Sequence, residues 1–534
     1  MTQRRAQSSA VLENFYERAS GDPDQLEIWG YTDRLSYEPG DTVRFHVSTT
    51  APTFGLQIIR DGWQPEVVFT RRGLPGTLHP TPADCSVRGC GWPVAYEFTV
   101  PPEWHSGGYV VKTVTETGGH DEIEHHGLFV VRPTPDRTAS PILLVAATST
   151  WLAYNDWGGS NAYEGITGPD RDQYSPILST QRPFSRGFVW LPEGAPRVPL
   201  PQAPEPGAAT RYPHMEWAYA NGFSKKYASA GWASYERHFV RWAEANDYRF
   251  DLATQHDLQF RPEILDRYRC VAIVGHDEYW SWEMRDAIDR YVEAGGRVAR
   301  FAGNFFWQIR LEDEGRTQVC YKYRARDEDP LFHSEDRHLT TTLWESLEVA
   351  RPGARTFGLN GTRGVYAGWG ACCPRGSGGF TVYRPEHWVF EGTDLHYGDV
   401  FGGEARIFGY EVDGLDYVVR NGLPWPTHED GAPEGIEILA MGLATLIEED
   451  HGNPGGVLFI GDSDVRFVAE AIYGDAGPDA IDRLKRGSGM IAVMPRGTGT
   501  VFNAGTCEWV AGLTRRDPFV DRITRNVLDT FLKP

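Results

Sequence analysis

The stretch "RCVAIVGHDEYWSWEMRDAIDRYVEAGGRVARFAGNFFW", residues 269–307, contains the unit on which the predicted fold of this chain depends. It opens with a continuous apolar run, which is typical of a strand buried on both faces. A polar turn follows, and then an amphipathic helix that we predict to begin at Tyr279. Gly295 and Gly296 separate this helix from a second apolar run, which ends before Asn304. Strand, helix and strand in this order predict a parallel sheet with crossover helices.

Polar residues gather where the predicted strands end. The turn "GHDEYW" brings His276 and Glu278 to the end of one strand, and Asn304 in "FAGNFFW" follows the next strand. An earlier apolar run, "ILLVAATST", leads into "WLAYNDWGGSNAYEG", which contains Tyr154 and Tyr163. Because open parallel sheets bind ligands at the carboxyl ends of their strands, we expect these side chains to share one rim of the sheet.

The pattern of apolar and polar residues divides the 534 residues of the chain into three parts. Residues 1–25 form an N-terminal arm. Residues 26–137 alternate apolar and polar positions in short runs between turn clusters, which predicts a β-sandwich. Residues 138–534 form an α/β domain, with a long excursion or lid at 191–213 and a β-rich insertion at about 320–440. The predicted fold class is therefore α/β plus all-β.

Charge and hydropathy limit the partners and the location of the chain. Asp and Glu number 73 against 52 Lys and Arg, a net charge of −21, which argues against nucleic acid as a partner. No stretch approaches the length of a membrane span, and the first residues contain no apolar run long enough for a signal sequence. We therefore expect a cytoplasmic protein that does not bind a membrane.

The cysteines do not predict a structural scaffold or a zinc site. Seven cysteines in a chain of this length are too few for a disulfide framework. Cys85 and Cys90 could pair across a short loop, and Cys372 and Cys373 could each find a distant partner. No CxxC motif occurs, which argues against a cysteine-based zinc site.

The polar turn at the strand end excludes several enzyme classes. A hydrolase sheet would carry a Ser or Cys nucleophile at the sharp strand-to-helix turn, and "VGHDEYW" contains neither. Phosphate-binding glycine motifs and HExxH are also missing from the positions that would need them. Phenol and carboxylate oxygens remain, and such hard ligands suit a hard cation. On residue types alone, however, an aromatic rim without a metal is the more common arrangement.

Six motifs in chain order carry a resemblance to a known family. They are "TWLAYNDWGGSNAYEG", "RWAEANDYRFDLATQHDL", "GHDEYWS", "GNFFWQIR", "FGYEVDGLD" and "GTVFNAGTCEWVAGL". In this order they resemble the large, catalytic subunit of N,N-dimethylformamidase over roughly residues 140–534. The resemblance implies an amidotransferase-like (flavodoxin-like) parallel-sheet domain beside a β-domain, and a mononuclear Fe³⁺ held by two tyrosines and one glutamate. It also implies an iron-dependent amidohydrolase that cleaves the C–N bond of small formamide-type or N-alkyl amides with metal-activated water.

The resemblance assigns the metal ligands position by position. Tyr154 in "WLAYN" and Glu278 in "GHDEYW" match the first tyrosine and the glutamate. Tyr163 in "SNAYEG" matches the second tyrosine. The loop between the two tyrosines is shorter here than in the family, so Tyr174 in "DQYSP" is an alternative to Tyr163.

The resemblance also assigns three catalytic residues. His276 would take a proton from water and return one to the amine, and Asn304 would stabilise the developing oxyanion or orient the amide oxygen. Glu411 in "GYEVD" would act as a base, or as the acid that protonates the leaving amine. Whether His276 or Glu411 is the base stays open.

Each of these residues also has a structural interpretation. Glu278, or more readily Asp277, could cap the helix predicted at Tyr279, and His276 could be a turn histidine. Asn304 after Gly303 could form a turn, and Glu411 could pair with an arginine. The iron hypothesis requires both phenols to converge on Glu278.

Two other classes of function compete with the hydrolase. One is a non-catalytic carbohydrate- or protein-binding protein, which the 18 tryptophans and the predicted β-sandwich would suit. The other is a glycoside hydrolase that uses Glu278 and Glu411 as its carboxylate pair.

The chain is shorter than the family enzyme, which pairs its large subunit with a small one. Residues 1–25 could take over part of the role of that small subunit. A homo-oligomer and a small accessory subunit are both compatible with the resemblance, and the accessory subunit is not required. We expect five aromatic side chains to line the pocket for a small amide substrate: Trp151, Trp157, Phe305, Phe306 and Trp307.

Overall fold

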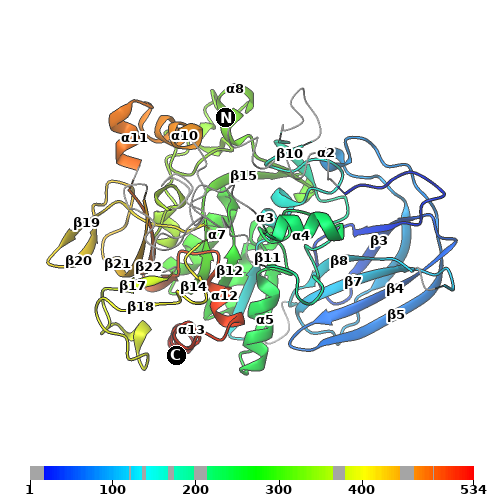
Figure 1. Ribbon diagram of the computed structural model, residues 1–534, viewed down its shortest axis with the longest axis horizontal. Helices are drawn as coiled ribbons and strands as arrows, with labels where there is room; N and C mark the ends of the chain where they lie inside the picture. Colours follow the sequence, from blue (N-terminus) through cyan, green and yellow to red (C-terminus); the bar gives the residue numbers. More distant parts are fainter. Residues whose placement is uncertain are drawn as a thin grey trace.

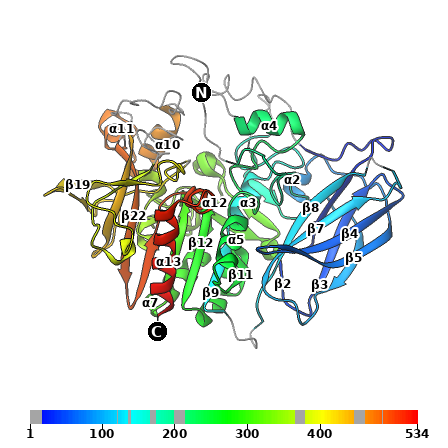
Figure 2. The same ribbon diagram turned by 60° about the horizontal axis from the view of Figure 1, so that its bottom comes forward.

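The fold was analysed in a computed structural model. It describes residues 17–119, 122–134, 140–165, 174–197, 213–364, 379–409, 411–445, 462–484 and 486–533. Figure 1 shows the N-terminal strands gathered in one lobe, coloured blue, beside a larger part in which helices surround a long sheet. Figure 2 shows the same two parts from another side.

Two sheets with one shared core form the N-terminal lobe. Their strand orders are β1-β3-β6 and β2-β8-β7-β4-β5. The strands are β1 (Ile28–Thr32), β2 (Ser36–Tyr37), β3 (Thr42–Thr49), β4 (Thr53–Asp61), β5 (Pro65–Pro75), β6 (Val94–Thr99), β7 (Gly107–Thr115) and β8 (Glu124–Val131). Phe45 from one sheet and Leu56 and Phe129 from the other belong to the same buried cluster. Because two sheets packed over one core are the arrangement of a β-sandwich, we propose that class for this lobe.

A nine-stranded sheet forms the centre of the larger part, with the order β11-β9-β12-β14-β23-β22-β21-β17-β18. Its strands are β9 (Ile142–Ala146), β11 (Phe250–Thr254), β12 (Cys270–His276), β14 (Arg297–Gly303), β17 (Phe380–Val382), β18 (Val400–Phe401), β21 (Glu437–Thr445), β22 (Arg486–Arg496) and β23 (Gly499–Asn503). The first five strands in this order pair in parallel, and the remaining pairs are antiparallel. By chain position the parallel strands follow the order 2-1-3-4-5, which is the flavodoxin-like order, so we propose that class for this domain.

Helices cover both faces of the parallel strands. On one side, Val271 and Ile273 of β12 belong to the core that includes α7 (Trp282–Glu293). On the other side, Ala272 and Val274 belong to the core that includes α5 (Glu236–Ala245), α12 (Trp509–Thr514) and α13 (Pro518–Leu532). Successive side chains of a strand point to opposite faces, so the continuous apolar run of β12 follows from its burial on both sides.

The helix predicted to begin at Tyr279 begins later, at Trp282. A short strand, β13 (Tyr279–Ser281), comes first and pairs with β15 (Trp307–Glu312). The hydroxyl of Ser281 accepts a hydrogen bond from the backbone N–H of Met284 at 3.2 Å and caps α7. The predicted capping by Asp277 or Glu278 is therefore wrong, since β13 separates both carboxylates from the helix.

A smaller sheet with the order β10-β16-β15-β13 lies next to this turn. Its other strands are β10 (Ile177–Ser179) and β16 (Thr317–Val319). Further helical elements are α2 (Cys85–Arg88), α3 (Thr148–Tyr154), α4 (Pro213–Asn221), α6 (Gln255–Phe260), η1 (Pro262–Arg267), η2 (Asp313–Gly315), η6 (Trp388–Phe390), α10 (Asp462–Tyr473) and α11 (Pro478–Leu484). No helix in the described ranges is long and apolar enough to cross a membrane.

Several sequence expectations can be compared directly with this arrangement. In the predicted β-rich insertion, the part up to residue 364 contains short helices instead: η3 (Lys322–Arg324), α8 (Ala325–Glu328), η4 (Arg337–Leu339), α9 (Ala354–Phe357) and η5 (Gly361–Arg363). Strands begin at Phe380, and beyond those of the main sheet they include the hairpin β19 (Tyr417–Arg420) and β20 (Leu423–Pro426). Cys85 and Cys90 are buried free thiols, so their predicted pairing is wrong. Cys372 and Cys373 lie outside the described residues, as does most of the predicted lid, 198–212.

Candidate active site

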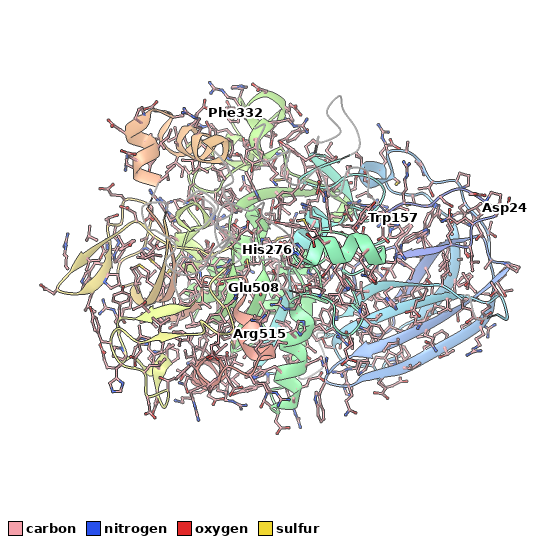
Figure 3. The ribbon with its side chains drawn as sticks, viewed as in Figure 1. Asp24, Trp157, His276, Phe332, Glu508 and Arg515 are labelled. Carbon is pink, nitrogen blue, oxygen red and sulfur yellow. The ribbon has the colours of Figure 1, made fainter. Side chains whose placement is uncertain are left out.

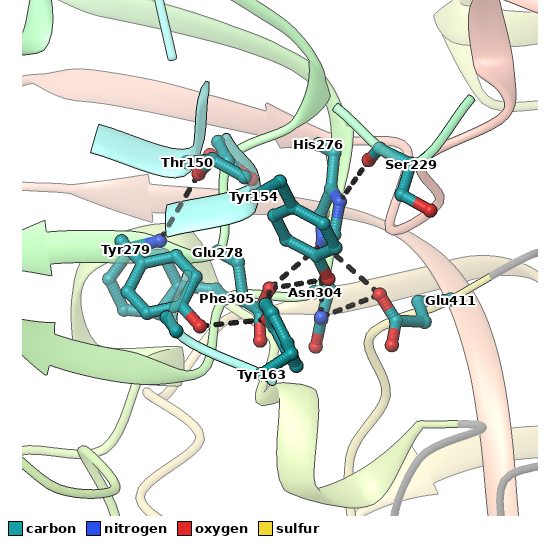
Figure 4. A network of polar contacts seen from close by, with 12 residues as sticks. Thr150, Tyr154, Tyr163, Ser229, His276, Glu278, Tyr279, Asn304, Phe305 and Glu411 are labelled. Atoms are coloured by element: carbon teal, nitrogen blue, oxygen red, sulfur yellow. Dashed lines mark hydrogen bonds and ion pairs between the residues drawn. The ribbon is translucent and has the colours of Figure 1, made fainter. Parts of the chain in front are cut away.

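Three of the predicted site residues, Tyr154, His276 and Asn304, lie at or just after the ends of the parallel strands β9, β12 and β14. His276 is the last residue of β12, and Asn304 directly follows β14. Tyr154 ends α3, the helix that follows β9. Neighbouring parallel strands end on the same side of a sheet, so these residues meet at its carboxyl edge, where Glu278, Tyr163 and Glu411 also lie (Figure 4).

Two phenols converge on one carboxylate oxygen. The Tyr154 hydroxyl donates to Oε2 of Glu278 at 3.0 Å, and the Tyr163 hydroxyl donates to the same oxygen at 2.5 Å (Figure 4). Tyr154 and Glu278 are buried, with 5% and 2% of their surfaces exposed. The hydroxyl of Tyr174, the alternative second tyrosine, instead donates to the backbone carbonyl of Tyr321 at 2.7 Å. The geometry therefore favours Tyr163 over Tyr174.

The orientation of His276 is fixed by the backbone. Its Nδ1 donates to the carbonyl of Ser229 at 2.7 Å, so Nε2 faces the site. This nitrogen lies 3.1 Å from Oε2 of Glu411 and 3.3 Å from Oε2 of Glu278. Burial alone would lower the pKa of His276, but the hydrogen bonds and charges of the two glutamates outweigh burial and raise it to about 10. The two carboxylates therefore favour the protonated form of His276.

Asn304 joins Glu411 to this histidine. Its Nδ2 donates to Oε2 of Glu411 at 2.7 Å and lies 3.1 Å from Nε2 of His276. The residue has a φ of 65°, in the left-handed region that Asn tolerates better than most residues, which agrees with the turn interpretation. Its place beside His276 and Glu411 is compatible with the site interpretation as well. Its Oδ1 is buried and has no hydrogen-bond partner among the described residues. An unsatisfied buried oxygen of this kind is free to take part in binding a ligand.

Two residues of the site were not predicted as such, Tyr279 and Lys322. The Tyr279 hydroxyl donates to that of Tyr163 at 2.7 Å, and Nζ of Lys322 donates to the Tyr279 hydroxyl at 2.9 Å. The same ammonium lies 3.6 Å from the centre of the Tyr163 ring. Burial lowers the pKa of Lys322 to about 8, although the negative charge of Glu278 opposes this. Lys322 is the first residue of η3, and three residues are too few to show a periodicity, so no pattern in the sequence pointed to it.

A buried ion-pair cluster lies next to the turn that carries His276 and Glu278. Arg300 binds Asp277 through two bonds, Nε to Oδ2 at 2.8 Å and Nη2 to Oδ1 at 2.5 Å. Its Nη1 donates to Oδ2 of Asp413 at 2.6 Å. All three side chains have no exposed surface. Because Asp277 precedes Glu278 and Asp413 follows Glu411 by two residues, Arg300 ties together the segments that carry both glutamates.

The aromatic residues expected to line a substrate pocket are packed in the core. Trp157 contacts Trp29 and Trp92 in a cluster beside the N-terminal lobe, with ring centroids 5.7 and 5.9 Å apart. Phe305 packs against Trp280, 5.8 Å between centroids, in the core beneath the sheet. For Trp157 and Phe305 the prediction of a pocket lining is therefore wrong. Trp151, Phe306 and Trp307 are also buried, each at most 3% exposed.

A second set of potential ligands overlaps with the first. Donor atoms of His276, Glu411 and Cys507 lie within 4.8 Å of one another. A nitrogen, oxygen and sulfur set would suit a softer cation than the two phenols and Glu278 would. Burial, followed by the negative charge of Glu411, raises the pKa of the Cys507 thiol well above its usual value. Burial raises the pKa of the Tyr163 phenol in the same way, so the pKa does not separate the two sets. The oxygen set is the better candidate for a hard cation because two phenols converge on one carboxylate oxygen.

Carboxylates, phenols, an imidazole and an amide meet at the carboxyl edge of the parallel strands, and all but the half-buried Tyr163 are buried. Together they define a candidate active site of an α/β protein. The family model described as "N,N-dimethylformamidase beta subunit-like, C-terminal" matches residues 55–522. The chain belongs to this family.

Two relatives extend the comparison. The chain is 25% identical over 490 residues to the N,N-dimethylformamidase beta subunit of an Alcaligenes species, and 24% identical over 492 residues to that of Paracoccus aminophilus. Each match covers 84% of this chain but only 55% of the relative, so the chain spans about half the length of these curated relatives. The predicted family is confirmed. The printed names specify the beta subunit, and they do not state that it is the large or catalytic one.

Proposed function

We propose that the protein is an iron-dependent amidohydrolase that cleaves the C–N bond of small formamide-type or N-alkyl amides to a carboxylate and an amine. Family membership supports amides as the substrate class, because the relatives are named for dimethylformamidase. The observation that carries the proposal is the convergence of the Tyr154 and Tyr163 hydroxyls on Oε2 of Glu278. The name of the relatives also supports an assembly of subunits, formed with further copies of this chain or with a small accessory chain.

The residues present fit a ferric ion. Tyr154, Tyr163 and Glu278 would hold it through three hard oxygen donors, which suit a hard cation. Burial, followed by the charges of Glu278 and Tyr154, raises the pKa of Tyr163 well above its usual value. A nearby cation would reverse this effect and favour the phenolate. When bound, Fe³⁺ supplies Lewis-acid chemistry, which polarises a carbonyl and lowers the pKa of water.

The protein's own groups would then orient the substrate and move protons. The bond from His276 Nδ1 to Ser229 leaves Nε2 as the atom that gains and loses a proton. This atom lies 3.1 Å from Oε2 of Glu411, so we propose that the two groups share one proton and act together as base and acid. The Nδ2–H of Asn304 now donates to Glu411, and it would have to turn from that carboxylate to donate to an amide oxygen or to the oxyanion that develops from it.

The competing functions gain less support from this site. Glu278 and Glu411 both contact the same nitrogen of His276 and are buried, whereas glycoside hydrolases hold their carboxylate pair across a sugar. Both phenols point to Glu278, which the glycosidase and the simple binding protein do not require.

The proposal is tested by hydrolysis of amides by iron-loaded protein. Dimethylformamide and a series of N-alkyl formamides and acetamides should release amine and carboxylate in equal amounts. Glu278→Gln should abolish the release, whereas Tyr174→Phe should keep it because Tyr174 bonds to the Tyr321 carbonyl instead. Iron-loaded protein that hydrolyses none of these amides, alone or with a small subunit from a relative, would contradict the proposed function.

A further inference from the structure

A second concave site lies outside the candidate active site. It is a pocket of about 550 Å³, in the size range of small-molecule sites. Among the described residues, its walls carry the basic side chains Arg197, Arg237, Arg406, Arg515 and His238. The segment 191–196, rich in proline and alanine, supplies a largely apolar wall. This basic lining contrasts with the net charge of −21 of the whole chain.

Two of the four arginines are already neutralised. Arg197 forms an ion pair with the buried carboxylate of Glu508, and Arg237 binds the buried carboxylate of Asp61 at 2.8 Å. Arg515 donates only to the backbone carbonyls of Glu404 and Ala405, at 3.4 and 3.2 Å.

Arg406 and Arg515 are exposed and form no ion pair with a carboxylate in the part of the chain that the structure describes, although the charge of Glu508 acts on Arg515. The one acidic side chain among the described lining, Glu193, is exposed and forms no ion pair with any described residue.

The positive charges crowd one another. Burial, followed by the charge of Arg197, lowers the pKa of Arg515 below its usual value. The negative charge of Glu508 opposes this shift, and the charge of Arg406 adds to it. Burial and the charges of Arg197 and Arg237 lower the pKa of His238 to about 3, so this histidine is neutral at pH 7. Like charges held together in a cavity are destabilising unless an anion binds between them.

The pocket is separate from the candidate active site. The Glu508 carboxylate that holds Arg197 also accepts a hydrogen bond from the Tyr235 hydroxyl at 3.1 Å. The Tyr235 ring in turn packs against His276, with ring centroids 6.4 Å apart. Figure 3 labels His276, Glu508 and Arg515, which follow one another through the middle of the molecule. The side chains of Glu508 and Tyr235 thus lie between the basic pocket and the candidate active site.

We propose that this pocket binds a small, multiply charged anion that carries phosphate or several carboxylate groups, with Arg406 and Arg515 as its principal contacts. Guanidinium groups match both kinds of oxyanion in bidentate geometry. The proposal does not depend on the amidohydrolase function.

Calorimetric titration with pyrophosphate and with citrate, at constant ionic strength, tests the proposal. We expect at least one of the two to bind, and the double variant Arg406→Ala/Arg515→Ala to weaken binding by at least about tenfold. The control is Arg71→Ala/Arg72→Ala, which removes the same charge from the exposed strand β5 and should leave binding unchanged. Binding of pyrophosphate alone would identify a phosphate ligand, and binding of citrate alone a polycarboxylate.

Either of two results would overturn the proposal. One is that neither anion binds the wild-type protein at about 1 mM. The other is that the pocket variant and the control variant lose affinity equally, which would indicate an effect of overall charge. Should the double variant fail to fold, the single variant Arg406→Gln gives the same comparison, because Arg406 is exposed and its side chain makes no hydrogen bond with a described residue.

Discussion

Replacing Arg300 by methionine should cost the protein much of its stability. The change leaves Asp277 and Asp413 buried without the guanidinium that now binds both, at 2.5 and 2.6 Å. Removing one partner of a buried ion pair typically costs about 3–5 kcal/mol. Methionine has a similar length, so little of this loss would come from a cavity.

The assay compares denaturant and thermal unfolding of Arg300→Met with those of Arg44→Met. Arg44 also bridges two carboxylates, Asp33 and Glu97, but it is exposed on the N-terminal lobe, where such pairs contribute little. We therefore expect a large fall in the unfolding midpoint for Arg300→Met and a small one for Arg44→Met.

The triple variant Arg300→Met/Asp277→Asn/Asp413→Asn should recover part of the stability, because the buried amides carry no charge. Equal midpoints for Arg300→Met and the wild type would refute the reasoning that Arg300 ties the two glutamate-bearing segments together.

Three further predictions follow from single side chains. Burial lowers the pKa of His125 to about 3, so the stability that its neutral form provides is complete above the unfolded pKa of about 6.5 and is lost as the pH falls below that value. The loss should reach about 2 kcal/mol at pH 5. In unfolding measured between pH 7 and 5, His125→Gln should be less sensitive to acid than the wild type. Gly275→Ala should destabilise the protein and lower activity, since Gly275 has a φ of 78° and an added Cβ would lie 2.3 Å from Cβ of Tyr235; a variant with unchanged melting temperature would contradict this. Asn304→Gly should reduce kcat about 100–1000-fold with little effect on folding, because a donor to the oxyanion is lost while glycine tolerates the φ of 65°. Steady-state kinetics and circular dichroism check this, and an unchanged kcat would remove Asn304 from the mechanism.

The sequence predicted which strand ends carry the candidate site better than it predicted the side chains packed around that site. Apolar runs at β9, β12 and β14 mark strands buried on both faces, and the residues after them must meet at one edge of the sheet. This argument placed His276 and Asn304 together, while the roles of the residues came from the resemblance.

Features that depend on long-range contacts could not be predicted. The three residues of β13 pair with β15, and this pairing displaces the start of α7 in a way that helical periodicity cannot show. The guanidinium of Arg300 lies on a strand whose pattern is otherwise apolar, and only the tertiary structure shows that it binds Asp277 and Asp413. Trp157 and Phe305 lie near site residues in the sequence, yet their side chains pack into other layers of the fold.

The central claim, a ferric ion held by two tyrosines and a glutamate, is tested most directly by the visible absorption spectrum of purified protein together with its iron content. The account predicts about one iron per chain and a tyrosinate-to-iron charge-transfer band. Tyr154→Phe or Tyr163→Phe should shift or abolish this band, and Tyr174→Phe should leave it unchanged because its hydroxyl bonds to Tyr321. A colourless protein that cannot be loaded with iron, or a band that survives the loss of both Tyr154 and Tyr163, would contradict the account.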